Sequence, residues 1–341
     1  MNDELSRLTK NITMRRMLLF LLTVAKWLAA SPSFLQVGGR PLAFILHRLS
    51  FIVLLMGSLP LAAQQLSHTD VILFTMMAGT DSIWRPTAPQ FLTVFNRRGY
   101  NNQPNFFSNN DLYLTVQLPT DTTQTDIYSL NLSSQTLTRV TETTPTAEYS
   151  PTLMFGGQRF SAVEVGEDGI QRLVSYPLDR SEGGRLEFPK ITGVGYHCWL
   201  RDTLAALFIV GQNDAPHVLY IAGTKGQKLQ RITANPGRCL LPVAGGKLAY
   251  VHQATDDTWY LKTFDPKKLT SDMLVKMPAK SEDFALLPNG TYLTGNGTKL
   301  WQYRPGREAT WQEVADLSKY GVKNISRLAI SRDGKLAVVV N

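Results

Sequence analysis

Polar and charged side chains recur at one position of a repeated sequence pattern, and they are the residues best suited to bind another molecule. Each stands at or near the start of an apolar phrase in the body of the chain. A carboxylate can accept hydrogen bonds, a guanidinium can bind an anion, and an imidazole can change its charge near neutral pH. The candidate binding residues are Glu148, Tyr149, His197, Arg238, Glu282, Asp283 and Arg327.

The rest of the sequence offers little catalytic chemistry. The Gly-x-Ser-x-Gly turn that exposes a nucleophilic serine in many hydrolases is absent from the chain. His68, His217 and His252 are scattered without the spacing of a metal site. We therefore expect a binding protein rather than an enzyme.

The two cysteines, Cys198 and Cys239, occupy equivalent positions in neighbouring repeats. In an oxidising compartment they could form a disulfide, which needs Cα atoms about 4.4–6.8 Å apart. The alternative is a pair of buried thiols. The sequence leaves both interpretations open.

The elements that must position these residues are short strands in a regular repeat. Six phrases of an apolar pair, a turn and a second apolar run begin at residues 105, 152, 198, 239, 283 and 327, so successive starts are 41 to 47 residues apart. Two further strand-like runs follow each of the first five phrases. Turn pairs such as Asp168-Gly169 and Asn289-Gly290 between the runs are typical of β-hairpins. Four strands every 40 to 45 residues or so predict the blade of a β-propeller.

The sixth repeat contains only its first two strands before Asn341. The strand-like runs 71–77 and 90–96 can supply the two missing outer strands. Such a closure joins both ends of the propeller in one sheet and removes an exposed sheet edge. The predicted fold is therefore all-β: a six-bladed β-propeller over residues 64–341, whose sixth blade is closed by strands from both termini.

Residues 1–63 form an N-terminal apolar leader ahead of the propeller. The run 49–63 has the length of the apolar core of a secretory signal peptide, with cleavage expected after Ala63. The run 17–30 is either an extension from an upstream start codon or a first membrane segment. We expect a periplasmic or extracellular protein that meets a membrane only through the leader, if the leader is not cleaved.

The positive charge of the chain is concentrated in this leader. The whole chain has 35 basic and 27 acidic residues, a formal net charge of +8. Residues 1–63 hold seven basic and two acidic residues, which leaves 28 basic and 25 acidic residues, or +3, for the rest. A nucleic-acid surface needs a basic stripe in the folded part, so we expect no nucleic acid among the partners.

The repeat phrases resemble the TolB-like six-bladed propellers of bacterial envelopes. The phrase PNFFSNNDLYLTVQ is followed by TDIYSLNL and LTRVTETT, and the last repeat reads ISRLAISRDGKLAVV. The resemblance covers about residues 70–341. It departs from the family pattern in the third and fourth repeats, where LRDT and PVAGG replace the usual Ser-Pro-Asp-Gly turn. The resemblance implies an extracytoplasmic binding propeller.

The fold predicts where the candidate residues lie. The first strand of each propeller blade lines the central channel, and its start lies at one mouth of that channel. The repeats therefore place the candidates in a polar ring around this mouth, where a ligand or partner site is expected. The ring either grips a peptide segment or a small anionic ligand, or its members pair with one another in a closed, water-filled channel.

Three functions remain open at this point. We favour a non-enzymatic binding or scaffold propeller, a monomer without a cofactor, whose partner is an envelope protein or a small ligand. The first alternative is a calcium-dependent hydrolase of lactones or esters, and the second is a purely structural module that docks through its outer blade faces. The oxygen ligands for calcium would come from Glu282, Asp283, Asn105 and Glu148.

Overall fold

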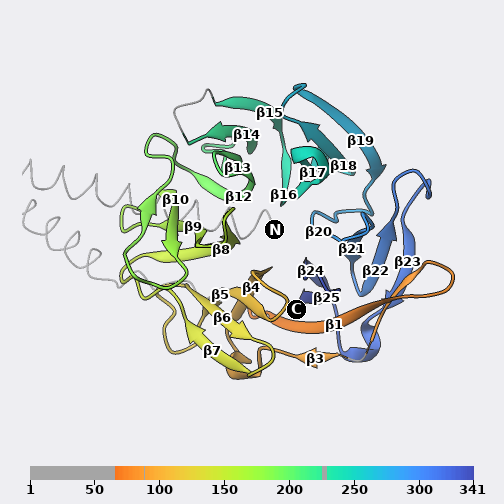
Figure 1. Ribbon diagram of the computed structural model, residues 1–341, viewed down its shortest axis with the longest axis horizontal. Helices are drawn as coiled ribbons and strands as arrows, with labels where there is room; N and C mark the ends of the chain where they lie inside the picture. Colours follow the sequence, from red (N-terminus) through yellow and green to blue (C-terminus); the bar gives the residue numbers. More distant parts are fainter. Residues whose placement is uncertain (1–65, 88, 225–228) are drawn as a thin grey trace, which may run out of the picture. The chain divides into compact units, whose positions relative to one another are not determined.

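The structure is a computed structural model that describes residues 66–87, 89–224 and 229–341. The leader of residues 1–63, its run 17–30 and the expected cleavage after Ala63 therefore lie outside the described residues. Within the described ranges no helix is long and apolar enough to cross a membrane. The described chain forms six antiparallel sheets arranged around a central axis (Figure 1).

Each of the first five sheets is one blade, built from four strands that are consecutive in the sequence. The first blade consists of β4 (Tyr100–Phe106), β5 (Asp111–Gln117), β6 (Asp126–Asn131) and β7 (Thr136–Arg139). The second consists of β8 (Ala147–Leu153), β9 (Arg159–Val165), β10 (Gln171–Pro177) and β11 (Arg185–Leu186), and the third of β12 (Val194–Arg201), β13 (Leu204–Ile209), β14 (Val218–Gly223) and β15 (Gln230–Ala234).

The fourth and fifth blades follow the same plan and carry two short 3-10 helices. The fourth consists of β16 (Pro236–Val243), β17 (Lys247–Thr255), β18 (Thr258–Asp265) and β19 (Thr270–Lys276), with η2 (Ala244–Gly246) between its first two strands. The fifth consists of β20 (Phe284–Leu286), β21 (Tyr292–Asn296), β22 (Lys299–Tyr303) and β23 (Gln312–Asp316), and η3 (Ser318–Tyr320) leads on to the sixth blade. The predicted repeat of four strands is confirmed.

The sixth blade joins the two ends of the propeller. Its inner strands are β24 (Ile325–Ile330) and β25 (Lys335–Val340), and its third strand is β1 (Asp70–Ala78). β1 pairs with β25 in antiparallel register, from Asp70 opposite Val340 to Thr75 opposite Lys335. The short strands β2 (Trp84–Pro86) and β3 (Gln90–Phe91) both pair with the outer edge of β1. The predicted closure by both termini is therefore confirmed.

The predicted outer strand over residues 90–96 is wrong beyond its first two residues. Only Gln90 and Phe91 pair as a strand, and Val94–Asn96 form the 3-10 helix η1. Thr93 explains the difference, because its hydroxyl accepts the Val71 amide at 3.1 Å and donates to the Asp70 carboxylate at 2.8 Å. The Thr93 side chain thus makes hydrogen bonds to β1 in place of a backbone ladder, and the chain turns into η1 after it.

The core lies between neighbouring blades, because successive strand residues face opposite sides of their sheet. β1 shows this directly. Val71 and Leu73 pack in a cluster with buried residues of the first blade, whereas Ile72 and Phe74 pack in another with residues of the fifth. Both clusters span two blades, so each blade depends on its neighbours for burial.

The first strands of the first and second blades each bulge at a residue in the left-handed conformation. The β4–β5 register shifts between Asn102 and Asn105, and Gln103 adopts a left-handed conformation with φ of 54°. Ser150 does the same in β8, with φ of 56°. The Gln103 side-chain oxygen accepts the Ser150 amide at 2.8 Å, so the two bulges are joined across the blade interface.

Candidate functional site

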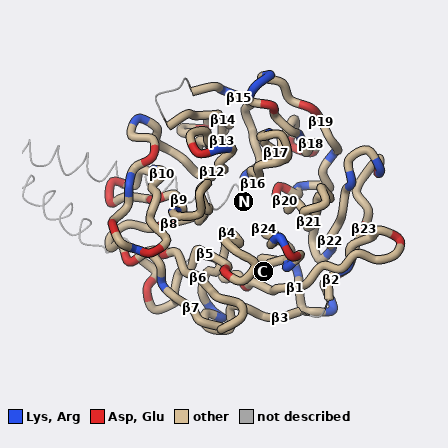
Figure 2. Tube along the Cα trace, viewed as in Figure 1, with Lys and Arg blue, Asp and Glu red and all other residues tan. Residues whose placement is uncertain are grey.

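Four blades send charged or polar side chains to the middle of the ring. They come from β12 of the third blade, β16 of the fourth, the start of β20 in the fifth and β24 of the sixth. Figure 2 shows basic segments of β16 and β24 and an acidic segment beside β20 around the central axis. We call this set the channel cluster, and it consists of Tyr196, Arg238, Glu282, Asp283 and Arg327.

Arg238 and Asp283 link three neighbouring blades within the channel cluster. The Arg238 Nε lies 3.7 Å from the Asp283 Oδ2, and its Nη2 donates to the backbone carbonyl of Ser326. The other Asp283 oxygen accepts the Leu328 amide at 2.7 Å. Burial raises the pKa of Asp283, and the two arginines of the cluster oppose that rise. The Asp283 carboxylate therefore has a structural role, because it connects the start of β20 to β24 through a hydrogen bond.

Arg327 reaches across the channel to the third blade. Its Nη2 donates to the Tyr196 hydroxyl at 3.0 Å, and its guanidinium carbon lies 5.1 Å from the centre of the Tyr196 ring. Two blades lie between β24 and β12 in either direction around the ring, so this contact joins opposite walls. A guanidinium over an aromatic ring gains electrostatic attraction from the ring face.

Glu282 is the second carboxylate of the channel cluster, and its surroundings differ from those of Asp283. Its side chain is buried, with the residue only 7% exposed, yet its Oε2 has no hydrogen-bond partner among the described residues. Burial raises the pKa of Glu282 most, Asp283 raises it further, and Arg238 and Arg327 lower it. A buried polar atom without a partner is costly, so this oxygen is an acceptor suited to a group from outside the protein.

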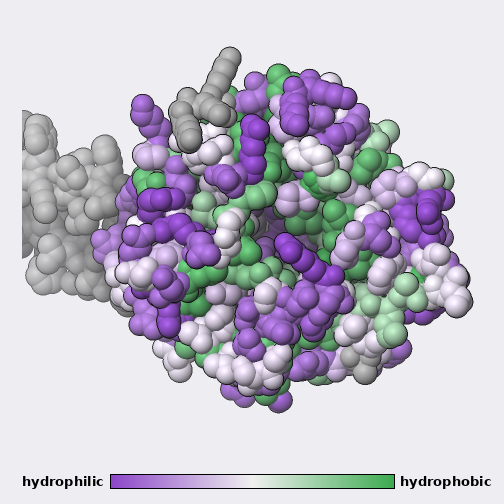
Figure 3. Space-filling model, viewed as in Figure 1, coloured by the Kyte–Doolittle hydropathy of each residue, from purple (hydrophilic) through white to green (hydrophobic). Residues whose placement is uncertain are grey.

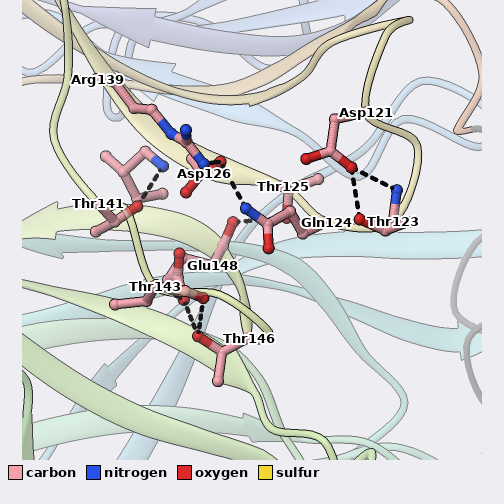
Figure 4. Close-up of polar contacts among 11 residues, drawn as sticks. Asp121, Thr123, Gln124, Thr125, Asp126, Arg139, Thr141, Thr143, Thr146 and Glu148 are labelled. Atoms are coloured by element: carbon pink, nitrogen blue, oxygen red, sulfur yellow. Dashed lines mark hydrogen bonds and ion pairs between the residues drawn. The ribbon is translucent and has the colours of Figure 1, made fainter.

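The threonine pocket is a second polar site, at the junction of the first and second blades. Glu148 is fully buried, and its Oε1 accepts hydrogen bonds from the hydroxyls of Thr143 and Thr146, the latter at 2.7 Å (Figure 4). Burial is the main cause that raises the pKa of Glu148, to about 7, and the threonine hydroxyls oppose it. We define the pocket as Thr143, Thr146 and Glu148.

An ion pair lies next to the threonine pocket. Arg139, at the end of β7, places its Nη2 2.7 Å from the Asp126 Oδ2, and Gln124 donates to the same oxygen at 3.5 Å (Figure 4). Burial raises the pKa of Asp126 despite the arginine. The charge of Arg139 is thus directed at Asp126, and Asp126 itself raises the pKa of Glu148.

His197 is buried between blades rather than exposed at the channel mouth. Its Nε2 lies 2.6 Å from the Ser161 Oγ, which also accepts the indole Nε1–H of Trp199 at 2.9 Å. Burial lowers the pKa of His197 to about 3, so the ring is neutral at physiological pH. A neutral, enclosed imidazole contributes to the packing between the second and third blades and adds no charge to the channel.

Tyr149 also belongs to the packing between blades. Its half-buried ring packs against the apolar cluster that includes Val163 and Leu173 of the second blade and Trp199 of the third. The structure therefore brings four of the seven predicted residues together in the channel cluster. It places the other three, Glu148, Tyr149 and His197, in contacts between blades.

The two cysteines are free thiols in the structure, so the disulfide that the sequence left open is not formed. The Cys239 thiol donates to the Phe284 carbonyl at 3.1 Å, and the Cys198 sulfur contacts the Trp199 carbonyl at 3.7 Å. Burial raises the pKa of both thiols. Each sulfur thus has its own backbone partner, and neither is activated as a nucleophile.

Sequence reasoning missed three members of these sites. Tyr196 stands directly before His197, and the repeat alignment placed the histidine, rather than the tyrosine, at the channel mouth. Thr143 and Thr146 lie in the connection between blades, where hydroxyl residues are common and carry no distinctive spacing. The only signal was the run TETTPT at residues 141–146, which ends two positions before Glu148.

The structure does not bring the expected calcium ligands together. Among the described residues, no group of three or more His, Cys, Asp or Glu side chains is arranged to hold a metal ion. Glu148 bonds to threonines, and Asp283 bonds to Arg238 and a backbone amide. Two of the four proposed ligands, Glu148 and Asp283, thus have separate partners.

Comparisons with known proteins identify similar folds at low sequence identity. No family model and no curated protein matches the chain. Among solved structures, one described as a TolB from Agrobacterium tumefaciens matches with a TM-score of 0.58 and 11% identity, over 80% of this chain and 98% of that one. TolB from Acinetobacter baumannii matches with a TM-score of 0.50 and 12% identity, over 90% and 72% of the two chains.

An enzyme shares the same architecture. An oligogalacturonate lyase, solved in complex with manganese, matches with a TM-score of 0.51 and 13% identity, over 76% of this chain and 82% of that one. Matches at such low sequence identity establish the fold only, and the function has to be argued from the site of this chain. The described part of the chain therefore has the TolB-like six-bladed β-propeller fold.

Proposed function

We propose that this protein is a non-enzymatic binding propeller that engages a protein segment or a small ligand through the channel cluster. The observation that carries the proposal is Glu282, a buried carboxylate with an oxygen atom that the described residues leave unpartnered. The favoured ligand presents a hydrogen-bond donor, such as an amine or a backbone N–H, to this oxygen.

The surroundings of Glu282 support a site of fixed shape. Arg238 is held by Ser326 and Asp283, and Arg327 is held by Tyr196, so both guanidinium groups are already oriented. The face drawn in Figure 3 is hollowed at the middle of the ring, with hydrophilic side chains beside the hollow. A concave surface with a few oriented polar groups is the usual form of a small binding site.

The expected location follows from the leader and the fold. An apolar run with the length of a signal peptide precedes the propeller in the sequence. The TolB-like fold of the described residues supports a place in the cell envelope. An envelope protein is accordingly the partner class that we propose, with a small ligand as the other class.

A crosslinked pulldown from envelope extract tests the proposal. The Glu282→Gln variant removes the charge of the carboxylate while its shape is kept, and Glu148→Gln is the matched control in the threonine pocket. Glu282→Gln should lose at least one partner that the wild type and Glu148→Gln both retain. Identical partner sets for all three proteins would show that binding uses another surface, such as the outer blade faces.

A further inference from the structure

A patch of apolar and basic side chains lies on the segment that joins the sixth blade to the first. Phe91, Val94 and Phe95 are 52%, 53% and 39% exposed, and Arg97 and Arg98 are exposed beside them. We call these five residues the rim patch. Figure 1 shows β3, which carries Phe91, at the outer edge of the ring. Single exposed apolar residues are ordinary, whereas three within five positions form a contact surface.

The segment that carries the rim patch is firmly held. Asn96 is buried, and its Nδ2 donates to the Asn101 Oδ1 at 3.0 Å and to the Gln117 carbonyl at 3.1 Å. A Cβ on Gly99 would lie 2.2 Å from the Asn96 Oδ1, so only glycine fits there. Asn96, a polar residue, is thus buried while the apolar Val94 and Phe95 directly before it face solvent, an arrangement that folding alone does not favour.

The charge of the rim patch has one sign. The sequence from Gln90 to Asn102 contains two arginines and no acidic residue. The nearby carboxylate of Asp70 accepts the Thr93 hydroxyl at 2.8 Å and lies 3.3 Å from His68. The guanidinium groups of Arg97 and Arg98 are therefore suited to phosphate groups on an anionic surface.

The segment that carries the rim patch is hydrogen-bonded to Thr69, which follows the apolar leader closely in the sequence. The Thr69 amide donates to the Gly99 carbonyl at 3.3 Å, and its hydroxyl donates to the Asn101 carbonyl at 2.8 Å. The chain thus enters the propeller beside the segment that carries the patch. Thr69 is six residues after Ala63, where the run 49–63 ends, and six extended residues span at most ~21 Å.

We propose that the rim patch docks the propeller on an anionic lipid bilayer. Phe91, Val94 and Phe95 enter the interfacial zone, while Arg97 and Arg98 contact headgroup phosphates. The apolar leader, while attached, keeps the patch near the bilayer surface and raises its effective concentration there. A protein partner is the less favoured occupant, because the patch presents no acidic residue to form mixed ion pairs at its edge.

Environment-sensitive labels on the full chain test this proposal. Phe95→Cys is labelled with a nitrobenzoxadiazole dye, and Phe155→Cys serves as the matched control, since Phe155 is 51% exposed in the second blade. The unsubstituted chain shows whether the two native cysteines react. The proteins are reconstituted into vesicles of zwitterionic lipid, or of zwitterionic and anionic lipid, with and without nitroxide-labelled lipid.

The label at position 95 should shift to shorter wavelength and lose emission to nitroxide lipid in anionic vesicles. Both effects should be lost in zwitterionic vesicles and in the Arg97→Gln/Arg98→Gln background, and the label at position 155 should show neither. Equal quenching at both positions, or none at position 95, overturns the proposal. A wavelength shift at position 95 without lipid quenching also overturns it and points to a protein occupant.

Discussion

The channel cluster and the threonine pocket hold buried carboxylates in opposite ways. In the channel cluster, Asp283 has Arg238 as an ionic partner, and Arg327 lowers the pKa of both acidic members. In the threonine pocket, Glu148 accepts hydrogen bonds from hydroxyl groups, while the nearby Arg139 forms an ion pair with Asp126. Both sites stand near the starts of first strands, so the repeat alone does not distinguish them.

The difference teaches how a propeller can use the same repeat position for two purposes. Burial without a counter-charge favours the neutral acid, so Glu148 behaves as a hydrogen-bonding group near neutral pH. In the channel cluster, two guanidinium groups oppose the rise in carboxylate pKa that burial causes, and they favour the charged form. The first arrangement closes a blade junction, and the second leaves charged groups available to a ligand.

The largest expected effect is the loss of Asp283. Asp283→Ala leaves Arg238 buried without its carboxylate and removes the acceptor for the Leu328 amide, so we expect destabilisation of about 3 kcal/mol or more. Urea unfolding at pH 7 measures this change. The double variant Arg238→Met/Asp283→Leu should recover part of the loss. A cost below ~1 kcal/mol for Asp283→Ala would show that the pair is solvated.

The second prediction concerns the pH dependence created by Glu148. Its folded-state pKa of about 7 lies above the ordinary 4.5, so the folded state binds the proton more tightly. This stabilisation is complete below pH ~4.5, falls as the pH rises to about 7, and is absent above. At about 1.36 kcal/mol per pH unit, the loss is roughly 3 kcal/mol.

Glu148→Gln should remove this dependence. Its melting temperature should exceed that of the wild type at pH 8 and approach it at pH 4.5. Calorimetry across this range makes the comparison, with Glu313→Gln, at an exposed carboxylate of the fifth blade, as the control. Parallel curves for Glu148→Gln and the wild type would contradict the assigned role of burial at the threonine pocket.

A smaller effect is expected from the contact across the channel. Tyr196→Phe keeps the ring beneath the Arg327 guanidinium and removes one hydrogen bond, which should cost about 1 kcal/mol. The matched variant Tyr303→Phe removes the hydroxyl that donates to the Leu274 carbonyl at 3.0 Å, away from the channel cluster. Chemical denaturation compares the two. If only Tyr196→Phe altered partner binding, the ligand site would extend to this wall.

The smallest expected effect is that of calcium. No group of three or more His, Cys, Asp or Glu side chains among the described residues is arranged to hold a metal ion, so added Ca²⁺ should leave the melting temperature unchanged. A metal that binds the folded state raises stability by RT ln(1 + [L]/Kd), so a titration is sensitive to even modest affinity. A calcium-dependent rise that disappears in Asp283→Asn would favour the hydrolase alternative and would place the metal in the channel cluster.

Particular residues show how far the sequence could be interpreted. Val71 and Ile72 alternate as a strand requires, and their opposite packing in the sixth blade was predictable from period and closure. Arg327 was predicted at the channel, but its partner Tyr196 lies 131 positions away, and the sequence gives no register between opposite blades. His197 occupies the same repeat position as the channel residues, yet its ring turns toward Ser161.

The sequence by itself determined the repeat, the number of blades and the pairing of the chain's beginning with its end. These follow from local patterns, because strand alternation and turn residues act over a few positions. Only the tertiary structure decided which carboxylate meets a guanidinium and which meets a hydroxyl. That choice depends on side-chain direction and on neighbours from other blades, and no local pattern carries this information.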